Sequence, residues 1–470
     1  MFDRFLLYYV VYFNIFIAIY LLIYTIFLMV NMVYGALHIL RSVRLERLHN
    51  VLEHDFYYPI SIMIPLYNEG KTGLQTVDNV LKQDYRLFEI IIIDDGSTDD
   101  TKQLCIDRYH LTQEIDRPIR YQVPCQQIKE VYAGIYEGRA ITLISKVNGR
   151  TKADAVNAGI NVCNYPYFVN MDGDEILQKD ALKWAARAIL EEDNVIGVGG
   201  NLRISNGVQF RDAIPSFFHF GKNLLPDIQT LEYGRNFAGA RIFHNVWNAN
   251  LIISGGYGVF KKSAVVEVGG YDSTSMGEDM EMTIRLHKHF MDKKEPYVMK
   301  YVEDSVCWTQ APHTFSDLRR QRQRWQCGLV QTIGKYKKMI LNPKYGIVGM
   351  FMFPYMIAYE LITPILMLMG WLCIAASFYL NIANFPFILF LYILFVFFSI
   401  VLTMLSYFAN CYRRRERISF LDVFMILGLG LFEAFVYRTF VAVVSFAAFF
   451  KKKTLKQAWK SPTRVEVKAD

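Results

Sequence analysis

The chain has 470 residues, of which 53% are hydrophobic and 15% are aromatic, and its formal net charge at pH 7 is +7. This apolar content is high for a soluble protein, so the composition excludes an ordinary soluble enzyme and indicates an integral membrane protein. No nucleic-acid-binding signature accompanies the positive charge, and the seven cysteines form neither a CxxC pair nor a His–Cys metal spacing. We therefore expect no nucleic-acid partner and cysteines that are reduced and structural.

Four long apolar blocks lie near the ends of the chain, at residues 5–33, 347–380, 385–409 and 420–450. Each block exceeds the roughly 20 apolar residues that cross the hydrocarbon core of a bilayer. The first block is too long for a cleaved signal peptide and lacks a small-residue cleavage site. We therefore predict that it is a retained membrane anchor.

The apolar blocks divide the chain into five parts. They are an N-terminal transmembrane segment (1–40), an α/β domain (41–317), amphipathic interface helices (318–346), a C-terminal transmembrane region (347–450) and a basic tail (451–470). Basic runs at 413–415 and 451–453 flank the spans, so the positive-inside rule places them and the α/β domain in the cytosol. This predicts a multi-pass protein of the plasma membrane that contacts anionic membrane lipids. If both runs are cytosolic, the block 420–450 is a tight hairpin or a segment lying on the membrane surface.

The α/β domain begins with a strand, a helix and a second strand. The pattern predicts a strand at 60–65, a helix at 76–82 and a β-branched strand at 88–93, which together form a βαβ unit of a parallel sheet. Asp94 and Asp95 follow the second strand at its carboxyl end, where a ligand could bind. Capping of the next helix is the commoner use of aspartate at this position.

The middle of the domain carries fewer signals. Residues 111–147 lack a long periodic pattern, so we predict an irregular excursion with one strand at 140–146. The segment 148–157 then opens a helix at 155–163 after a turn. Free backbone N–H groups and Lys152 at this helix start would attract phosphate.

An apolar run at 167–171 ends in Asp172-Gly173-Asp174. It predicts a buried strand that delivers two aspartates to the carboxyl edge of the sheet, where open α/β sheets bind ligands. Two carboxylates one residue apart can turn toward one Mg²⁺ or Mn²⁺ ion, which shares its other sites with water and substrate phosphates. A nucleotide-linked substrate is the first hypothesis, and a solvated acidic turn is the alternative.

Two further features follow downstream. Gly256 and Tyr257 lie in a glycine-rich stretch that allows another molecule to approach the backbone, although packed β-bulges would have the same sequence. Glu278 and Asp279 begin a predicted helix, where acidic residues also occur simply because they complement the helix dipole.

A basic amphipathic helix is predicted at 318–338, directly before the C-terminal spans, and it contains Gln321, Arg324 and Trp325. Alone, such a helix is most often an interfacial anchor. Together with Asp95 and the two acidic motifs it completes an ordered series of D, DxD, ED and QxxRW. This series resembles that of the membrane-embedded, processive family 2 glycosyltransferases, the group of cellulose synthase, hyaluronan synthase and poly-N-acetylglucosamine synthase.

The resemblance implies a GT-A-like, Rossmann-type mixed sheet domain inserted between transmembrane helices, and it assigns roles to the motif residues. Asp279 would be the general base and Asp174 the ligand of Mg²⁺ or Mn²⁺. The nucleotide would be bound by Asp94, Asp95, Lys152, Asp172 and Arg324, and the acceptor by Glu278, Gln321, Trp325, Gly256 and Tyr257. The chain departs from the cellulose synthase pattern at Gly277, where a threonine commonly precedes the Glu-Asp pair.

The implied activity is the inverting polymerisation of a UDP-hexose, UDP-N-acetylglucosamine or UDP-glucose, into a β-linked polysaccharide that is extruded across the membrane. One base and direct displacement would invert the anomeric configuration. The alternatives are a non-processive enzyme that adds one sugar to a lipid acceptor and a non-catalytic scaffold or export channel. Glu360, Glu433 and Arg438 in the apolar blocks would line a polysaccharide channel or pair helices with one another.

Overall fold

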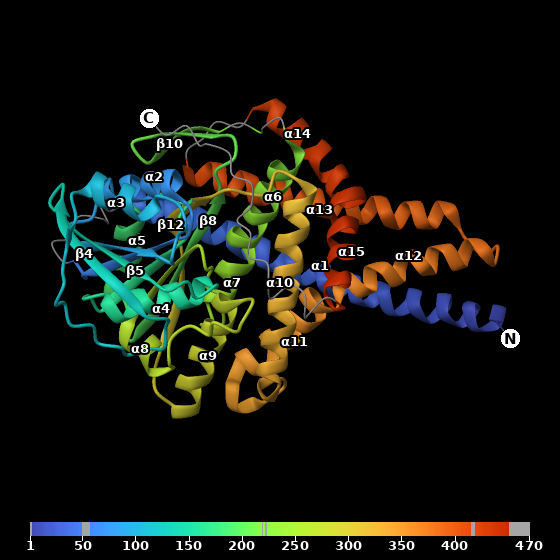
Figure 1. Ribbon diagram of the computed structural model, residues 1–470. Coiled ribbons are helices and arrows are strands. Elements are labelled where there is room, and N and C mark those ends of the chain that lie inside the picture. Colours follow the sequence, from blue (N-terminus) through green and yellow to red (C-terminus); the bar gives the residue numbers. More distant parts are fainter. Residues whose placement is uncertain (1, 49–56, 219, 221–222, 415–418, 451–470) are drawn as a thin grey trace.

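The computed structural model describes residues 2–48, 57–218, 220, 223–414 and 419–450. The basic tail predicted at 451–470, including the run 451–453, therefore lies outside the described residues. Figure 1 shows a mixed sheet with helices on both faces, joined on one side to a group of long helices.

The strands are β1 (Ile60–Leu66), β2 (Phe88–Asp94), β3 (Thr112–Gln113), β4 (Ile128–Tyr136), β5 (Arg139–Lys146), β6 (Tyr167–Met171), β7 (Ile176–Leu177), β8 (Val195–Ile204), β9 (Val208–Arg211), β10 (Ile214–Phe218), β11 (Tyr257–Lys261) and β12 (Val298–Thr309). The helices of the α/β domain are α2 (Gly70–Leu81), α3 (Thr101–Tyr109), α4 (Lys152–Val162), α5 (Ala181–Leu190), α6 (Leu224–Arg235), η1 (Asn236–Ala240), α7 (Arg241–Asn245), α8 (Lys262–Glu267) and α9 (Glu278–Lys293).

Ten strands form one sheet in the order β3-β4-β5-β2-β1-β6-β11-β8-β12-β7, and β9 and β10 form a separate hairpin. The central strands β5, β2, β1 and β6 are parallel, as the predicted βαβ unit requires. Alternation along β2 places Ile90 and Ile92 in one core cluster and Ile91 and Ile93 in the other, so the strand is buried on both faces. The carboxyl ends of these strands therefore meet at one edge of the sheet.

The antiparallel strand β11 completes this edge. Its first residue, Tyr257, lies opposite Met171, the last residue of β6. Because the two strands run in opposite directions, the glycines before β11 lie beside the Asp172-Gly173-Asp174 turn that follows β6. Sequence segments about 80 residues apart are thus brought together at the position where a ligand is expected.

The prediction of an irregular excursion at 111–147 is wrong in part, because β4 is a nine-residue strand paired antiparallel with β5. Only Ile128 and Val131 of β4 are buried, since the strand lies near the edge of the sheet. A half-exposed strand of this kind carries no clear apolar alternation. Glu137 and Gly138, both with positive φ, form the turn that joins it to β5.

The remaining helices are α1 (Phe2–Leu48), α10 (Phe315–Lys335), the short helices η2 (Lys337–Met339) and η3 (Pro343–Tyr345), η4 (Val348–Met352), α11 (Phe353–Tyr355), η5 (Met356–Leu361), α12 (Thr363–Tyr379), α13 (Phe385–Arg414), α14 (Phe420–Phe432), η6 (Glu433–Tyr437) and α15 (Arg438–Ala448). Three described helices are long and apolar enough to cross a membrane, namely Phe2–Val43, Phe385–Arg413 and Phe420–Ala448. A fourth candidate is the pair Val348–Leu361 and Thr363–Tyr379, which is bent by 44°.

The predicted hairpin at 420–450 is wrong, because α14, η6 and α15 form one continuous helix from Phe420 to Ala448. Figure 1 shows this helix (red) running across α12 and α13 (orange) rather than parallel to them. α15 packs against both α10 and α12. The second alternative from the sequence, a segment lying on the membrane surface, agrees with this crossing orientation.

Candidate active site

One cavity of about 1490 Å³ extends from the carboxyl edge of the sheet into the space between α1, α12, α13 and α15. Nine of the twelve predicted site residues line it: Lys152, Asp172, Asp174, Gly256, Glu278, Asp279, Gln321, Arg324 and Trp325. The structure thus brings together four motifs that are spread over more than 170 residues of sequence. The cavity is the candidate active site.

Lys152 lies at the start of α4 and joins two walls of the cavity. Its Nζ donates to Asp172 Oδ1 and, at 2.6 Å, to the carbonyl oxygen of Gly255. Thr151 caps the helix by accepting a hydrogen bond from the backbone N–H of Asp154. Burial alone would lower the pKa of Lys152, but the Asp172 carboxylate outweighs it and raises the pKa. Lys152 therefore presents a fixed positive charge to an anionic ligand.

Glu175 is a buried carboxyl behind the Asp172-Gly173-Asp174 turn, and sequence analysis overlooked it. Its burial, followed by the charges of Asp172 and Asp174, raises its pKa well above the usual value. A Cβ added to Gly256 would lie 2.2 Å from Glu175 Oε1, so any larger residue at this position would displace the Glu175 carboxyl group. Glu175 thus packs directly behind the glycine that precedes Tyr257.

Asp172 and Asp174 could hold a divalent cation only if a bound ligand supplied further donor atoms. Within the described part of the chain, no three His, Cys, Asp or Glu side chains are arranged to hold a metal ion. Both aspartates line the cavity and offer the hard oxygen donors that Mg²⁺ and Mn²⁺ prefer, although Lys152 engages one oxygen of Asp172. Such an ion would take its other ligands from water and a diphosphate.

Glu278 and Asp279 begin α9 and line the cavity beside Gly255, the residue whose carbonyl oxygen Lys152 contacts. Asp279 Oδ2 accepts a hydrogen bond of 3.0 Å from the backbone N–H of Gly255, and its Oδ1 accepts one of 2.8 Å from Met280. Burial and the neighbouring Asp279 charge raise the pKa of Glu278. Both residues thus place a carboxyl group at the start of α9 in the cavity lining.

Arg324 and Trp325 lie on α10 with exposed side chains that line the cavity, and Gln321 lies one turn before them. The Oε1 atom of Gln321 is buried, and no described residue donates a hydrogen bond to it. A buried acceptor without a partner is costly, so this atom is suited to receive a ligand hydroxyl. α10 thus contributes a cation, an aromatic face and an acceptor atom to one wall.

Arg322 supports this wall from behind, although sequence analysis assigned it no role. Its guanidinium lies 4.4 Å from the centroid of the Trp325 ring and fixes the ring by a cation–π contact. The same guanidinium donates to both carboxylate oxygens of Glu232, at 2.9 and 2.7 Å, and to the hydroxyl of Tyr437 at 2.8 Å. One arginine therefore ties α6, α10 and η6 together at the cavity, which Arg322, Glu232 and Tyr437 all line.

We expect Arg322→Leu to lower the free energy of unfolding by about 3 kcal/mol, because it leaves the Glu232 carboxylate without its bidentate partner. Arg319→Leu on the same helix is the control, since Arg319 is exposed and the loss of a surface charge should cost less than about 1 kcal/mol. Unfolding of the purified proteins in detergent measures both changes. Equal stability of the two variants would contradict this account.

Three predicted site residues lie outside the cavity lining. Tyr257 is fully buried and shares a 2.6 Å hydrogen bond with Ser305, so its position argues against the predicted acceptor contact. Asp94 accepts hydrogen bonds from Ser97 and Ser145 within the protein. Direct nucleotide contact by this aspartate remains a prediction that the arrangement does not support.

Asp95 is likewise buried, and it accepts from Lys146 Nζ and from the backbone N–H of Gly149 at 3.1 Å. Lys146 also pairs with Asp154 at 2.6 Å. These contacts fix the loop that leads to Lys152 at the start of α4. The geometry therefore supports a positioning role for Asp95, and its direct contact with the nucleotide stays a prediction.

The membrane part of the cavity contains the polar residues noted in the apolar blocks. Glu433 accepts hydrogen bonds from Arg235 at 2.6 and 3.1 Å and from Arg438 at 3.0 and 3.1 Å. Helix pairing is thus confirmed for Glu433 through Arg235 of α6, and for Arg438 through a 2.7 Å hydrogen bond from its Nη2 to Ser399 Oγ of α13. Because these residues and Glu360 also line the cavity, helix pairing and a polar channel lining are compatible.

Comparisons with known proteins identify the family of the chain. Residues 167–413 match the family described as glycosyl transferase family group 2, and residues 61–121 match glycosyl transferase family 2. The chain therefore belongs to glycosyl transferase family group 2. Its sheet is the GT-A-like, mixed α/β arrangement expected from the sequence, with apolar helices in the N-terminal and C-terminal regions.

Among curated proteins, the chain is 30% identical over 269 residues to the poly-beta-1,6-N-acetyl-D-glucosamine synthase of Staphylococcus aureus, which covers 57% of this chain and 54% of the relative. It is 28% identical over 278 residues to the synthase of the same name from Staphylococcus epidermidis, covering 59% and 56%. The matched part of the chain thus spans about half the length of these relatives.

Two solved structures are more distant. The mannosyltransferase PcManGT from Pyrobaculum calidifontis, in complex with GDP-Man and Mn²⁺, has a TM-score of 0.47 and 18% identity, covering 91% of this chain and 97% of that chain. TarS 1–349 of S. aureus, in complex with UDP, has a TM-score of 0.34 and 13% identity, covering 58% and 65%.

Proposed function

We propose that the protein is a processive, inverting glycosyltransferase that polymerises a UDP-hexose into a β-linked polysaccharide and passes it across the membrane. The observation that carries the proposal is the single cavity, because it joins Asp172, Asp174 and Asp279 to the space between the membrane helices. The name of the curated relatives supports UDP-N-acetylglucosamine as the first donor to test, with UDP-glucose as the second.

Asp279 is the proposed general base. The acceptor hydroxyl oxygen attacks the anomeric carbon of the donor while Asp279 takes the hydroxyl proton, and the bond between the sugar and the diphosphate breaks. Arg324 and Lys152 stabilise the negative charge that develops on the departing UDP. Direct displacement by one nucleophile inverts the anomeric centre, so an α-linked donor gives a β-linked product.

A bound Mg²⁺ or Mn²⁺ supplies Lewis-acid stabilisation of the diphosphate. Asp174 and the second oxygen of Asp172 are the proposed protein ligands. Trp325 offers its ring face to the acceptor sugar, and Arg322 holds that ring in place from the other side. Gln321 and Glu278 complete the proposed acceptor site on the same side of the cavity.

The crossing helices suggest how the protein sits in the plasma membrane. We propose that α1, α12 and α13 cross the bilayer, whereas α14, η6 and α15 lie along its cytosolic surface beside α10. Both ends of the last helix then lie on one side, and the α/β domain and both basic runs are cytosolic, as the positive-inside rule requires. Apolar side chains on the bilayer-facing surface and the basic residues then contact membrane lipids.

The proposal is tested by measuring UDP release from a panel of UDP-sugars by the purified protein in detergent with Mg²⁺ or Mn²⁺. We expect one donor to be preferred and release to fall to background in EDTA and to return when metal is added, because the described residues alone supply too few ligands to hold the ion against a chelator. UDP release that is independent of both donor and metal would contradict the proposed site.

Transfer of one sugar to a lipid acceptor is a second candidate function. It is favoured by the apolar lining of the cavity on two membrane helices, with Leu366, Met367 and Trp371 on α12 and Ile388, Leu391 and Phe395 on α13. A lipid tail could occupy this region while its head group reaches Trp325. Product size separates the two functions, since this activity yields only short glycolipid even when donor is in excess.

A further inference from the structure

One stripe of α10 is in close contact with the segment that carries the proposed base. Gly328, Gln331 and Lys335 are spaced three and four residues apart and therefore lie on one side of the helix. A Cβ added to Gly328 would lie 2.8 Å from the backbone nitrogen of Gly277, so the two backbones touch. The backbone N–H of Met276 donates to Gln331 Oε1 at 2.9 Å.

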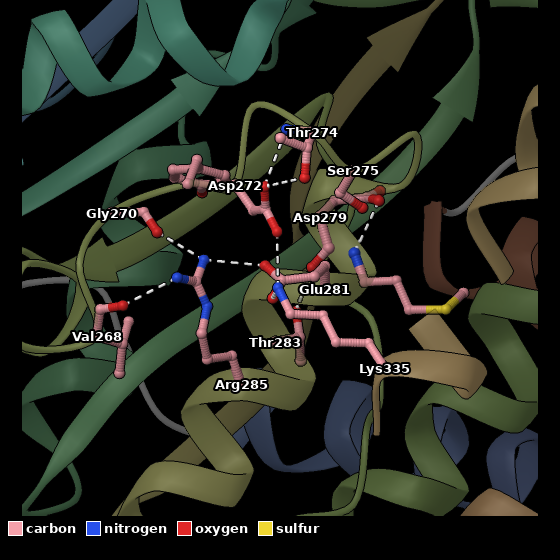
Figure 2. A network of polar contacts seen from close by, with 12 residues as sticks. Val268, Gly270, Asp272, Thr274, Ser275, Asp279, Glu281, Thr283, Arg285 and Lys335 are labelled. Atoms are coloured by element: carbon pink, nitrogen blue, oxygen red, sulfur yellow. Dashed lines mark hydrogen bonds and ion pairs between the residues drawn. The ribbon is translucent and has the colours of Figure 1, made fainter. Parts of the chain in front are cut away.

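Lys335 ends this stripe and binds two acidic residues of the facing segment. Its Nζ donates to Asp272 Oδ2 and to Glu281 Oε1, both at 2.6 Å. Figure 2 shows the lysine side chain reaching Glu281 at the start of α9 and the Asp272 loop beside it. The last turn of α10 is therefore joined to both sides of the segment 272–281.

Glu281 is the centre of the network, although it is only 1% exposed. Besides Lys335, it accepts from the Tyr336 hydroxyl at 2.6 Å and from Arg285 Nη2 at 2.9 Å. Arg285 in turn donates to the carbonyl oxygens of Val268 and Gly270, at 2.9 and 2.6 Å (Figure 2). Two cations and a hydroxyl thus satisfy this buried carboxylate, as such a group requires.

This network connects the two walls of the cavity without lining it. Asp279 lies two residues before Glu281 on α9, and Arg324 lies four residues before Gly328 on the contact stripe of α10. Neither Lys335 nor Glu281 is among the residues that line the cavity. Any shift of α9 along α10 would therefore change the separation between the base and the diphosphate-binding arginine.

We propose that Lys335 is a positioning residue that, with Glu281 and the Gly277–Gly328 contact, sets the distance between Asp279 and Arg324. The inference rests on the proposed function, because that function makes Asp279 the base and Arg324 the residue that binds the leaving group. A displacement of about 1 Å between reacting groups can lower turnover about a hundredfold. Donor binding depends less on this distance, so the effect is on kcat.

The test compares Lys335→Met, which keeps the side-chain length but removes its charge, with Lys335→Arg and wild type. We expect Lys335→Met to lower kcat at least about tenfold while the donor KM changes less than about twofold, and Lys335→Arg to recover most of the loss. Lys344→Met is the matched control, because Lys344 forms an exposed 2.5 Å ion pair with Asp292 at the far end of α9. This control should behave as wild type.

Amide hydrogen exchange of the same purified proteins provides a readout that is independent of turnover. We expect faster exchange at residues 276–281 in Lys335→Met than in Lys344→Met, because the segment loses its tie to α10. Unchanged kcat in Lys335→Met, or equal losses in the two methionine variants, would overturn the inference. If wild type releases no UDP from any donor, the proposed function fails. The contact of Lys335 with segment 272–281 is then judged by hydrogen exchange alone, and unchanged exchange at 276–281 in Lys335→Met would overturn it as well.

Discussion

Asp279→Asn is expected to lower kcat for sugar transfer about 10³-fold, because asparagine cannot take the proton of the acceptor hydroxyl. The amide oxygen of asparagine can still accept the hydrogen bond from Gly255, and only the bond from the adjacent Met280 N–H is lost, so most of the local structure should be kept. The donor KM should therefore change little. Steady-state UDP release with the preferred donor measures both parameters.

Asp292→Asn at the other end of α9 is the matched control, since it makes the same chemical change outside the cavity. We expect it to retain nearly full turnover. If Asp279→Asn kept more than a tenth of the wild-type kcat, Asp279 would not be the base. Glu278 would then be examined next, because it is the adjacent carboxyl on the same wall.

Arg324→Ala is expected to lower kcat about 10²- to 10³-fold, because it removes a cation that stabilises charge on the departing diphosphate. The loss should be mainly in kcat, since the charge develops during bond breaking. Arg324→Lys should recover only part of it, because an ammonium group cannot form the paired hydrogen bonds of a guanidinium.

Arg319→Ala is the control for this prediction, because Arg319 is exposed on the same helix but does not line the cavity. Its turnover should match wild type within about twofold, as expected for a solvated surface charge. A similar loss in both alanine variants would indicate a general effect of charge on α10, and Arg324 would lose its assigned role.

The strands that build the site could be predicted because they are buried on both faces. β1, β2 and β6 are nearly continuous apolar runs, and Asp94 and Asp172 mark where two of them end. β4 could not be found in this way, since its partly exposed side chains follow no apolar period. Prediction succeeded where burial leaves a pattern in local sequence.

The motif residues were also found from short patterns, and most of them line one cavity. The partners that hold them were not found, because Arg322 and Glu232 are 90 residues apart and Lys335 and Glu281 are 54 apart. No local spacing identifies such pairs. Tyr257 shows that a local pattern can also mislead. Its glycine-rich stretch indicated a backbone that another molecule could approach, but β11 buries the Tyr257 side chain, and its hydroxyl shares a hydrogen bond with Ser305.

The block 420–450 illustrates a limit of charge counting in membrane segments. Basic runs at both ends left a hairpin or a surface-lying segment as alternatives, and the structure has one continuous helix with a π-helical segment at Glu433–Tyr437. Glu433 lies within this segment and pairs with Arg235, a residue about 200 positions earlier. Pairing inside the protein explains why a charge is tolerated there.

The most direct test of the central claim is the size and linkage of the product made by the purified protein from its preferred UDP-sugar. Early samples with donor in large excess are sized on a gel, and the anomeric configuration is read by NMR. We predict long chains from the first minutes, linked in the β configuration. Short glycolipid alone would contradict polymerisation, and α-linked product would contradict direct displacement assisted by Asp279.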